Sequence, residues 1–177
     1  MWDSDIVLKD YDPKWSILYK KEEEQILELL KGRVLGIEHI GSTAIPGMLA
    51  YPAIDILVGI DSFSEIRMVA KPIKRLKYDV IPRPDLSPRR FYEKKLLNQI
   101  GYHLHLCEYK SEDWFNLVLF RDYLKKYPDV ADQYAQYKFM LSRKYKNNPI
   151  RYHLNKRSFV KEILEIAREE FGNEILL

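Results

Sequence analysis

Asp55 is the residue whose setting in this chain most strongly suggests chemistry. It stands third in the run AIDILVGI, residues 53–60, which is apolar on both sides of the carboxylate. Such a run predicts a strand with both faces covered, where an unpaired carboxylate costs on the order of several kcal/mol. Two interpretations follow: Asp55 pairs with a buried arginine or caps a backbone turn, or it binds a metal ion or substrate at the end of the strand.

A glycine–serine turn precedes this strand. Gly41 and Ser42 open the segment GSTAIPG, residues 41–47. A turn of this kind that leads into a helix offers backbone N–H groups and a hydroxyl to a phosphate, although such turns also occur with no ligand. We expect His39, just before the turn, either to hydrogen-bond across this loop or to have no role in it.

Two histidines alternate on a later apolar run. His103 and His105 share one face of the predicted strand with Cys107, whereas Glu108 lies on the other face. If the histidine face meets Asp55, the two imidazoles suit a general base or a softer divalent ion. If the opposite face does, Glu108 supplies a further carboxylate. A purely structural histidine pair is the third interpretation, and Cys107 is expected to be a small buried residue.

Basic side chains complete the candidate set. They are the pair Arg89-Arg90, of which Arg90 is the chosen candidate, with Arg121, Lys138 and Lys156. Arginine can hold a phosphate with two parallel hydrogen bonds. Lys138 follows Tyr134 by four residues, so the two share a helix face, and Lys156 follows Tyr152 in the same way. The alternatives are a solvated strand end for Arg90, a carboxylate partner for Arg121 and surface exposure for the lysines.

Helices and strands must position these residues. Helical spacing predicts a first helix capped by Asp12 and ended by Gly32, and a second over 63–76 capped by Ser62. Apolar and β-branched runs predict strands over 34–40, 53–60, 78–81, 91–97 and 101–108, the last two paired near Asn98-Gln99. Three helices follow: one capped by Ser111 and ending near 126, one over 128–146 and one over 149–171.

Composition excludes several classes of protein. The chain has 177 residues, of which 46% are hydrophobic and 31% charged, with one cysteine and a net charge of +3. These values exclude a disordered chain, a disulfide framework and a cysteine-based zinc ribbon, and the charge is too small to suggest nucleic-acid binding. No apolar stretch reaches the roughly 20 residues of a membrane span. The segment before the first helix is too short for a signal peptide, so we expect a cytoplasmic protein.

The order of elements predicts an α+β fold. A mixed β-sheet core with helices would occupy residues 1–110, and a C-terminal segment of three helices would occupy 111–177 and pack on the core as one compact unit.

The longest motifs resemble a known family. The segments HIGSTAIPG (39–47), YPAIDILV (51–58), HLHL (103–106) and LFRDYL (119–124), followed by Tyr134, Lys138, Tyr152, Lys156 and Phe159, resemble the GrpB family, also called UPF0157. The likeness covers about residues 6–167. It implies a nucleotidyltransferase-like fold, since the family is placed in the nucleotidyltransferase superfamily.

This resemblance assigns expected roles. Members of the superfamily hold two divalent cations on two aspartates two residues apart, but position 57 is Leu57. Asp55 alone would then carry Mg²⁺, with His103 and His105 as further catalytic candidates. Gly41 and Ser42 would take the terminal phosphates. The remaining nucleotide contacts would come from Arg90, Arg121, Lys138, Tyr152 and Lys156.

Two functions follow from the resemblance. The first is binding of a nucleoside triphosphate, or a related phosphorylated small molecule, with Mg²⁺ and transfer of a nucleotidyl group to an acceptor hydroxyl. The second is an inactive ligand-binding or protein-interaction module, favoured by Leu57, that supports an enzyme using coenzyme A or a nucleotide. Neither needs a nucleic acid or a membrane.

Overall fold

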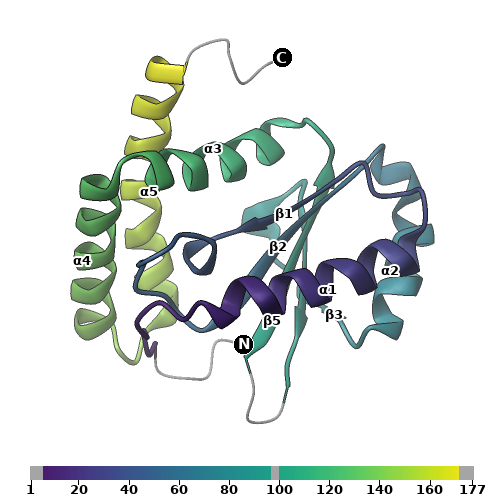
Figure 1. The fold of residues 1–177 in the computed structure, drawn as a ribbon, viewed down its shortest axis with the longest axis horizontal. Helices are drawn as coiled ribbons and strands as arrows, with labels where there is room; N and C mark the ends of the chain where they lie inside the picture. Colours follow the sequence, from purple (N-terminus) through teal and green to yellow (C-terminus); the bar gives the residue numbers. More distant parts are fainter. Residues whose placement is uncertain (1–5, 97–99, 172–177) are drawn as a thin grey trace.

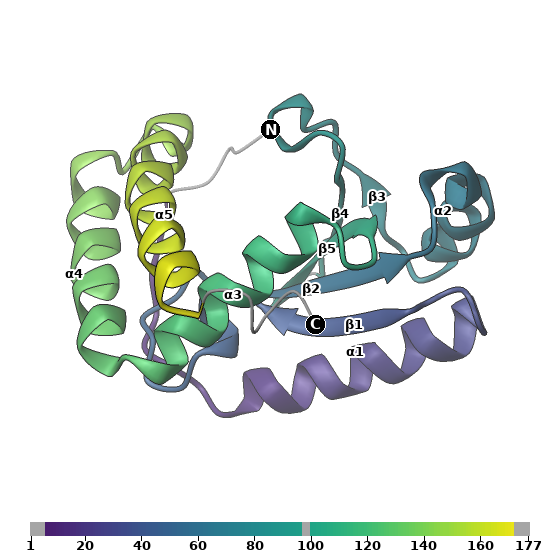
Figure 2. The same ribbon diagram turned by 90° about the horizontal axis from the view of Figure 1, so that it is seen from above.

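A computed structural model describes residues 6–96 and 100–171 (Figures 1 and 2). The helices are α1 (Lys14–Leu30), α2 (Ile66–Arg75), α3 (Glu112–Lys126), α4 (Pro128–Lys144) and α5 (Pro149–Phe171). The strands are β1 (Gly36–Ile40), β2 (Ala53–Ile60), β3 (Asp79–Val80), β4 (Arg90–Lys94) and β5 (Gly101–Glu108). Single 3-10 turns occupy Ser42–Ala44, Phe63–Glu65 and Pro84–Leu86. The α+β fold is therefore confirmed.

The five strands form one mixed sheet in the order β1-β2-β5-β4-β3. The two central strands, β2 and β5, run parallel, and the other pairs are antiparallel. The register places Asp55 beside His103, and Glu93 of β4 on the far side of His103. Since neighbouring strands are about 4.8 Å apart, these three side chains form a row across one face of the sheet.

The two faces of the sheet carry different layers. Alternate residues of β2 and β5, among them Ile56 and Leu104, pack with Trp15 and Ile26 of α1 in the main hydrophobic core. On the other face Leu57 packs with Ile40, Cys107 and Trp114 of α3. Figure 2 shows α1 on one side of the sheet, with α3 and α5 on the other. Asp55 lies on the face that carries α3.

The C-terminal helices have a core of their own. Leu124 of α3, Tyr134 of α4 and Ile163 of α5 pack together with Ile45 and Met48 from the loop between β1 and β2. This loop therefore connects the helical layer to the sheet. Among the described residues, no helix has the length and apolar character that a membrane crossing demands.

Several predicted caps are present. The carboxylate of Asp12 accepts a hydrogen bond from Lys14 N at 2.9 Å, and Ser111 Oγ accepts one from Trp114 N at 3.3 Å. Ser62 Oγ accepts from Ser64 N, but the first turn of the predicted helix is 3-10 and α2 begins at Ile66.

Some boundaries differ from the sequence prediction. β1 begins at Gly36 rather than at residue 34, β3 has only two residues and α4 ends at Lys144. Leu35 N still bonds to Gly59 O, so the chain beside β1 stays attached to the sheet. The predicted turn at Asn98-Gln99 lies outside the described residues.

Candidate functional site

The row of charged groups on the sheet centres on His103. Its Nδ1 donates to Asp55 Oδ1 at 3.1 Å, and its Nε2 lies 3.8 Å from Glu93 Oε1. Burial lowers the pKa of His103, but the two carboxylates outweigh this effect and raise the pKa to about 9. His103 is therefore an imidazolium at neutral pH.

His105 also bonds to Asp55, but unlike His103 it favours the neutral form of the ring. Its Nε2 donates to Asp55 Oδ1 at 3.4 Å, and its buried Nδ1 has no hydrogen-bond partner among the described residues. Burial, together with the charges of Arg89 and His103, lowers the pKa of His105 to about 4, so this ring is neutral. Burial raises the pKa of Asp55, but the hydrogen bonds from the two histidines hold it well below its usual range.

The histidine face, and not the Glu108 face, meets Asp55. Glu108 lies on the opposite side of β5, where its Oε1 accepts a hydrogen bond from Phe63 N at 2.9 Å. The interpretation that Glu108 supplies a carboxylate to the site is therefore wrong, because side chains alternate along a strand without a bulge here. Cys107 is buried as expected, and burial raises the pKa of its thiol to about 11.

The glycine–serine turn lies directly against Asp55. Gly41 has φ +72°, and a Cβ on this residue would stand 2.3 Å from Asp55 Oδ2. His39 supports the turn, because its Nε2 lies 3.1 Å from Thr43 Oγ1, which itself donates to Ala53 O at 3.2 Å. His39 therefore does hydrogen-bond across the loop, with Nε2 as the donor.

Lys138 reaches the same turn from α4. Its Nζ donates to Ser42 Oγ at 2.7 Å and also to Leu49 O, and it lies 4.7 Å from the centre of the Tyr134 ring. Lys138 is only 2% exposed, and burial together with the charge of Lys156 lowers its pKa to about 6. Burial also lowers the pKa of Lys156.

These groups line one cavity of about 330 Å³. Its lining includes the predicted Gly41, Ser42, Asp55, His103, His105, Lys138, Tyr152 and Lys156. Among the aspartates and glutamates of the described chain, only Asp55 belongs to the lining, whereas the lysines and arginines are Arg83, Arg89, Lys138, Lys156 and Arg157. Aromatic walls come from Phe91, Phe120 and Tyr134. The cavity therefore combines basic groups with apolar surface, which suits an anionic ligand with an aromatic part.

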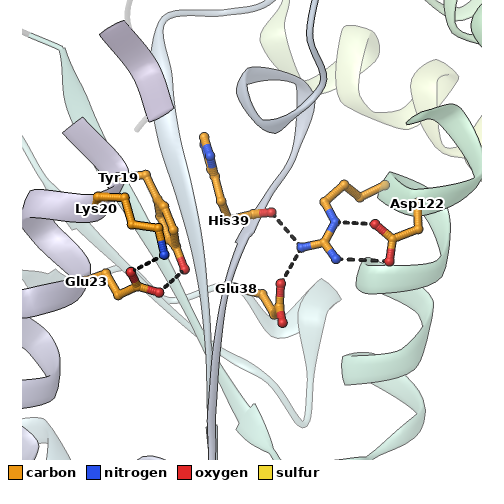
Figure 3. A network of polar contacts seen from close by, with 7 residues as sticks. Tyr19, Lys20, Glu23, Glu38, His39 and Asp122 are labelled. Carbon is orange, nitrogen blue, oxygen red and sulfur yellow. Dashed lines mark hydrogen bonds and ion pairs between the residues drawn. The ribbon is translucent and has the colours of Figure 1, made fainter. Parts of the chain in front are cut away.

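Two predicted phosphate-binding residues lie outside the cavity lining. Arg90 follows the alternation of β4, and its guanidinium stands 5.6 Å from the Phe63 ring, on the opposite face. Arg121 is 8% exposed and bonds to Glu38 Oε2 at 2.6 Å, to His39 O and to both carboxylate oxygens of Asp122. Figure 3 shows Glu38, Asp122 and the His39 carbonyl gathered around this guanidinium. Arg121 thus joins α3 to β1 through ion pairs. Of the two interpretations of Arg121, the structure shows the carboxylate partner.

The sequence prediction considered the pair Arg89-Arg90 but chose Arg90, and it missed Arg83 and Arg157. Arg89, rather than Arg90, faces the cavity, and its buried Nε has no hydrogen-bond partner in the described chain. The sequence signal is the spacing of two, because Arg89, just before β4, lines the cavity together with Phe91 of β4, which pairs with His105 in the sheet. Arg83 and Arg157 come from segments whose meeting no sequence pattern indicates.

The donor set does not fit a two-metal centre. Leu57, at the position of a second aspartate, is fully buried against Trp114. Both histidines direct their nitrogens at Asp55 Oδ1, and the described residues include no group of three or more metal-ligating side chains arranged around one point. Mg²⁺ prefers oxygen ligands in octahedral geometry, and Asp55 is the only carboxylate in the lining of the cavity as the described residues form it.

The fold defines the class of protein. Solved structures that share it include the Cid1 poly(U) polymerase with bound MgGTP (TM-score 0.53, 11% identity, 74% of this chain and 44% of that one) and terminal uridylyl transferase 4 from Trypanosoma brucei with bound UTP (0.53, 15%, 88% and 50%). At such identities the likeness concerns the fold alone, which is nucleotidyltransferase-like.

Within this class, the chain belongs to the GrpB family, whose model, "GrpB protein", matches residues 5–166. The structure of the conserved protein GrpB from Enterococcus faecalis superposes with a TM-score of 0.84 at 26% identity, over 93% of this chain and 99% of that one. The glutamate-rich protein GrpB of Alkalihalophilus pseudofirmus is 33% identical over 90% of this chain and 94% of its own length. The UPF0157 protein YqkA of Bacillus subtilis is 29% identical, and the match covers 89% of this chain but only 46% of that protein.

Proposed function

We propose that this protein binds a nucleoside triphosphate, or a related phosphorylated small molecule, in the cavity between the sheet and the C-terminal helices. The observation that carries the proposal is the basic lining of the cavity, where five lysine and arginine side chains and the His103 imidazolium accompany Asp55, the one carboxylate of the described lining. Phosphate oxygens are the ligand groups that such a site favours.

The turn and α4 would bind the phosphates. Lys138 already bonds to Ser42 Oγ, so the amine and the hydroxyl lie within reach of one phosphate group. An arriving phosphate favours the charged form of Lys138 and opposes the effect of burial on its pKa. The aromatic rings of the walls, such as Phe120, would contact the base.

Asp55 has a positioning role in this proposal. By accepting hydrogen bonds from both histidines, it fixes the two rings on the floor of the cavity. In this proposal Mg²⁺ has no site built by the protein and is bound only by the phosphates of the nucleotide, as it is in solution. Nucleotidyl transfer by the two-metal route would lack its second carboxylate, so we propose binding as the function.

The experiment is thermal unfolding with ATP, GTP, CTP and UTP, each with and without Mg²⁺. A ligand at about 100 times its dissociation constant adds about 2.7 kcal/mol, which raises the Tm by roughly 5–10 °C for a domain of this size. Lys138→Met should abolish the shift, because it removes the amine but keeps an apolar chain of similar length. Lys144→Met, at an exposed lysine of the same helix, should retain it.

Analysis of the same mixtures for released pyrophosphate separates binding from transfer. A folded wild type with no shift for any nucleotide contradicts the proposal. The second candidate, an interaction module that retains the fold, would then be favoured, and Leu57 is the observation that supports it.

A further inference from the structure

A second, smaller cavity lies beside the first, where the loop between β3 and β4 meets α5. Its volume is about 230 Å³, and Arg83, Asp85, Leu154 and Arg157 are part of its lining. Arg83 and Arg157 line both cavities, whereas Asp85 lines only the outer one. In Figure 2 this loop and α5 both rise on the α3 side of the sheet. The contact between loop and helix is therefore hollow, and polar groups border it.

One carboxylate connects the two arginines. Arg83 Nε donates to Asp85 Oδ1 at 2.9 Å and Arg83 NH2 donates to Oδ2 at 2.8 Å, which is a two-bond pair. From α5, Arg157 NH2 donates to the same Oδ2. The Arg83 guanidinium also stands 5.7 Å from the ring of Phe91, a wall of the inner cavity. Asp85 is thus held as a bound anion would be held.

The two guanidinium groups would repel each other without this carboxylate. Hydrogen bonding to Arg83 holds the pKa of Asp85 well below its usual range, so the negative charge is present at every pH near neutrality. Arg83 meets the carboxylate through two parallel N–H groups and Arg157 adds a third donor, and the same set of donors suits the oxygens of a phosphate. A phosphate group at the mouth could therefore take the place of Asp85 without separating loop and helix.

We propose that Arg83 and Arg157 form a second phosphate subsite at the mouth of the cavity, which Asp85 occupies as an internal substitute until a ligand replaces it. This inference deepens the proposed function, on which it rests: the ligand carries one phosphate to Ser42 and Lys138 and presents another at the mouth. Asp85 then competes with the ligand and keeps the loop in place while the subsite is empty of ligand.

Hydrogen exchange at the amide of Leu86 tests this subsite, because Leu86 N donates to Arg83 O within the loop at 2.9 Å. In Asp85→Asn without ligand, the amide should exchange about threefold faster than in the wild type, as expected for losing a partly exposed ion pair. Inorganic triphosphate at millimolar concentration should restore the wild-type rate, whereas sodium chloride at equal ionic strength should not. Asp132→Asn, an equal change of charge at an exposed site on α4, should leave the rate unchanged.

Two further arms locate the effect and identify its chemistry. In the double variant Asp85→Asn/Arg157→Leu, triphosphate should no longer restore protection, because half of the subsite is gone. Acetate tests whether a carboxylate is sufficient. If acetate restored the wild-type exchange rate as well as triphosphate does, the assignment of the subsite to phosphate would be overturned.

An unchanged rate in Asp85→Asn, or a faster rate that triphosphate does not reverse, would overturn the subsite. If triphosphate restores protection while no nucleotide raises the Tm of the wild type, the proposed function fails and the subsite stands. If nucleotides raise the Tm but Asp85→Asn behaves like the wild type, the proposed function stands and the subsite fails.

Discussion

At the scale of single residues, the two histidines of β5 show how strongly position decides charge. His103 and His105 have the same side chain, share a strand face and bond to the same oxygen of Asp55. His103 also faces Glu93, whereas His105 is beside Phe91 in the register of the sheet and is influenced by Arg89. One ring is therefore charged and the other neutral, a difference that the His-x-His pattern alone could not reveal.

The charge of His103 predicts a pH dependence of stability. Its pKa is about 6.5 in the unfolded chain and about 9 in the folded protein. A raised folded pKa stabilises the protein fully below pH 6.5, and this stabilisation is lost as the pH rises through 9. The shift corresponds to roughly 3 kcal/mol between these limits. Lys138, whose folded pKa is lowered, acts in the opposite direction, so the effect must be measured as a difference between variants.

The measurement is the free energy of unfolding in urea from pH 6 to 9.5 for the wild type and His103→Gln. The advantage of the wild type should be complete near pH 6 and should shrink as the pH rises from about 6.5 to 9. His39→Gln is the matched control above about pH 7.5, since burial lowers the pKa of folded His39 to about 4 and the unfolded imidazole, with a pKa of about 6.5, is also neutral there. Parallel profiles for the wild type and His103→Gln would contradict the assigned charge.

At the scale of elements, the turn between β1 and β2 decides whether the site can form. The sequence predicted the turn, both strands and Asp55, because apolar runs and Gly-Ser segments are local signals. It did not predict how close the turn comes to Asp55, or that β2 and β5 pair in parallel so that Asp55 lies beside His103. Arg90 was chosen over Arg89 for the same reason, since the face of a strand depends on a register set by distant residues.

Substitution of Gly41 tests this close approach. In Gly41→Ala the new Cβ would both strain a backbone at φ +72° and press on Asp55 Oδ2. Gly47 also has a positive φ, +78°, with nothing within 4 Å of its Cβ position, so Gly47→Ala reports the cost of a positive φ without a clash, about 1 kcal/mol, whereas Gly41 has in addition a ψ of −174° that only glycine adopts readily. Gly41→Ala should cost clearly more stability in urea unfolding and should lose nucleotide-dependent stabilisation. Equal costs for the two variants would show that the turn and Asp55 can move apart freely.

At the scale of the whole molecule, the sheet separates two polar systems. On the α1 face, Lys94 Nζ donates to both carboxylate oxygens of Glu22 at 2.8 Å, and both residues are buried. On the other face lie Asp55, the histidines and the cavity. The sequence pattern predicted the elements of both layers but neither the buried ion pair nor the meeting of Arg83 and Arg157, which depend on packing between remote segments.

The ion pair predicts a stability effect that leaves ligand binding unchanged. Lys94→Met strands the Glu22 carboxylate in the core and should cost about 3–5 kcal/mol, whereas Glu22→Leu/Lys94→Met should recover most of this loss. Urea unfolding measures both variants, and the rise in Tm with a binding nucleotide should remain in the double variant. A double variant no more stable than Lys94→Met would indicate that the pair is needed for packing and not only for charge balance.

The parallel pairing of β2 with β5 also has a kinetic consequence. Asp55 and His103 are separated by 48 residues, and α2, β3 and β4 lie between the two strands along the chain. Closing so long a loop is entropically costly, and parallel strands with distant partners pair slowly. The helices can therefore form before the central strands meet. During refolding, the circular dichroism signal of the helices should recover before the capacity to bind ligand. Formation of the cavity is therefore the last step of folding.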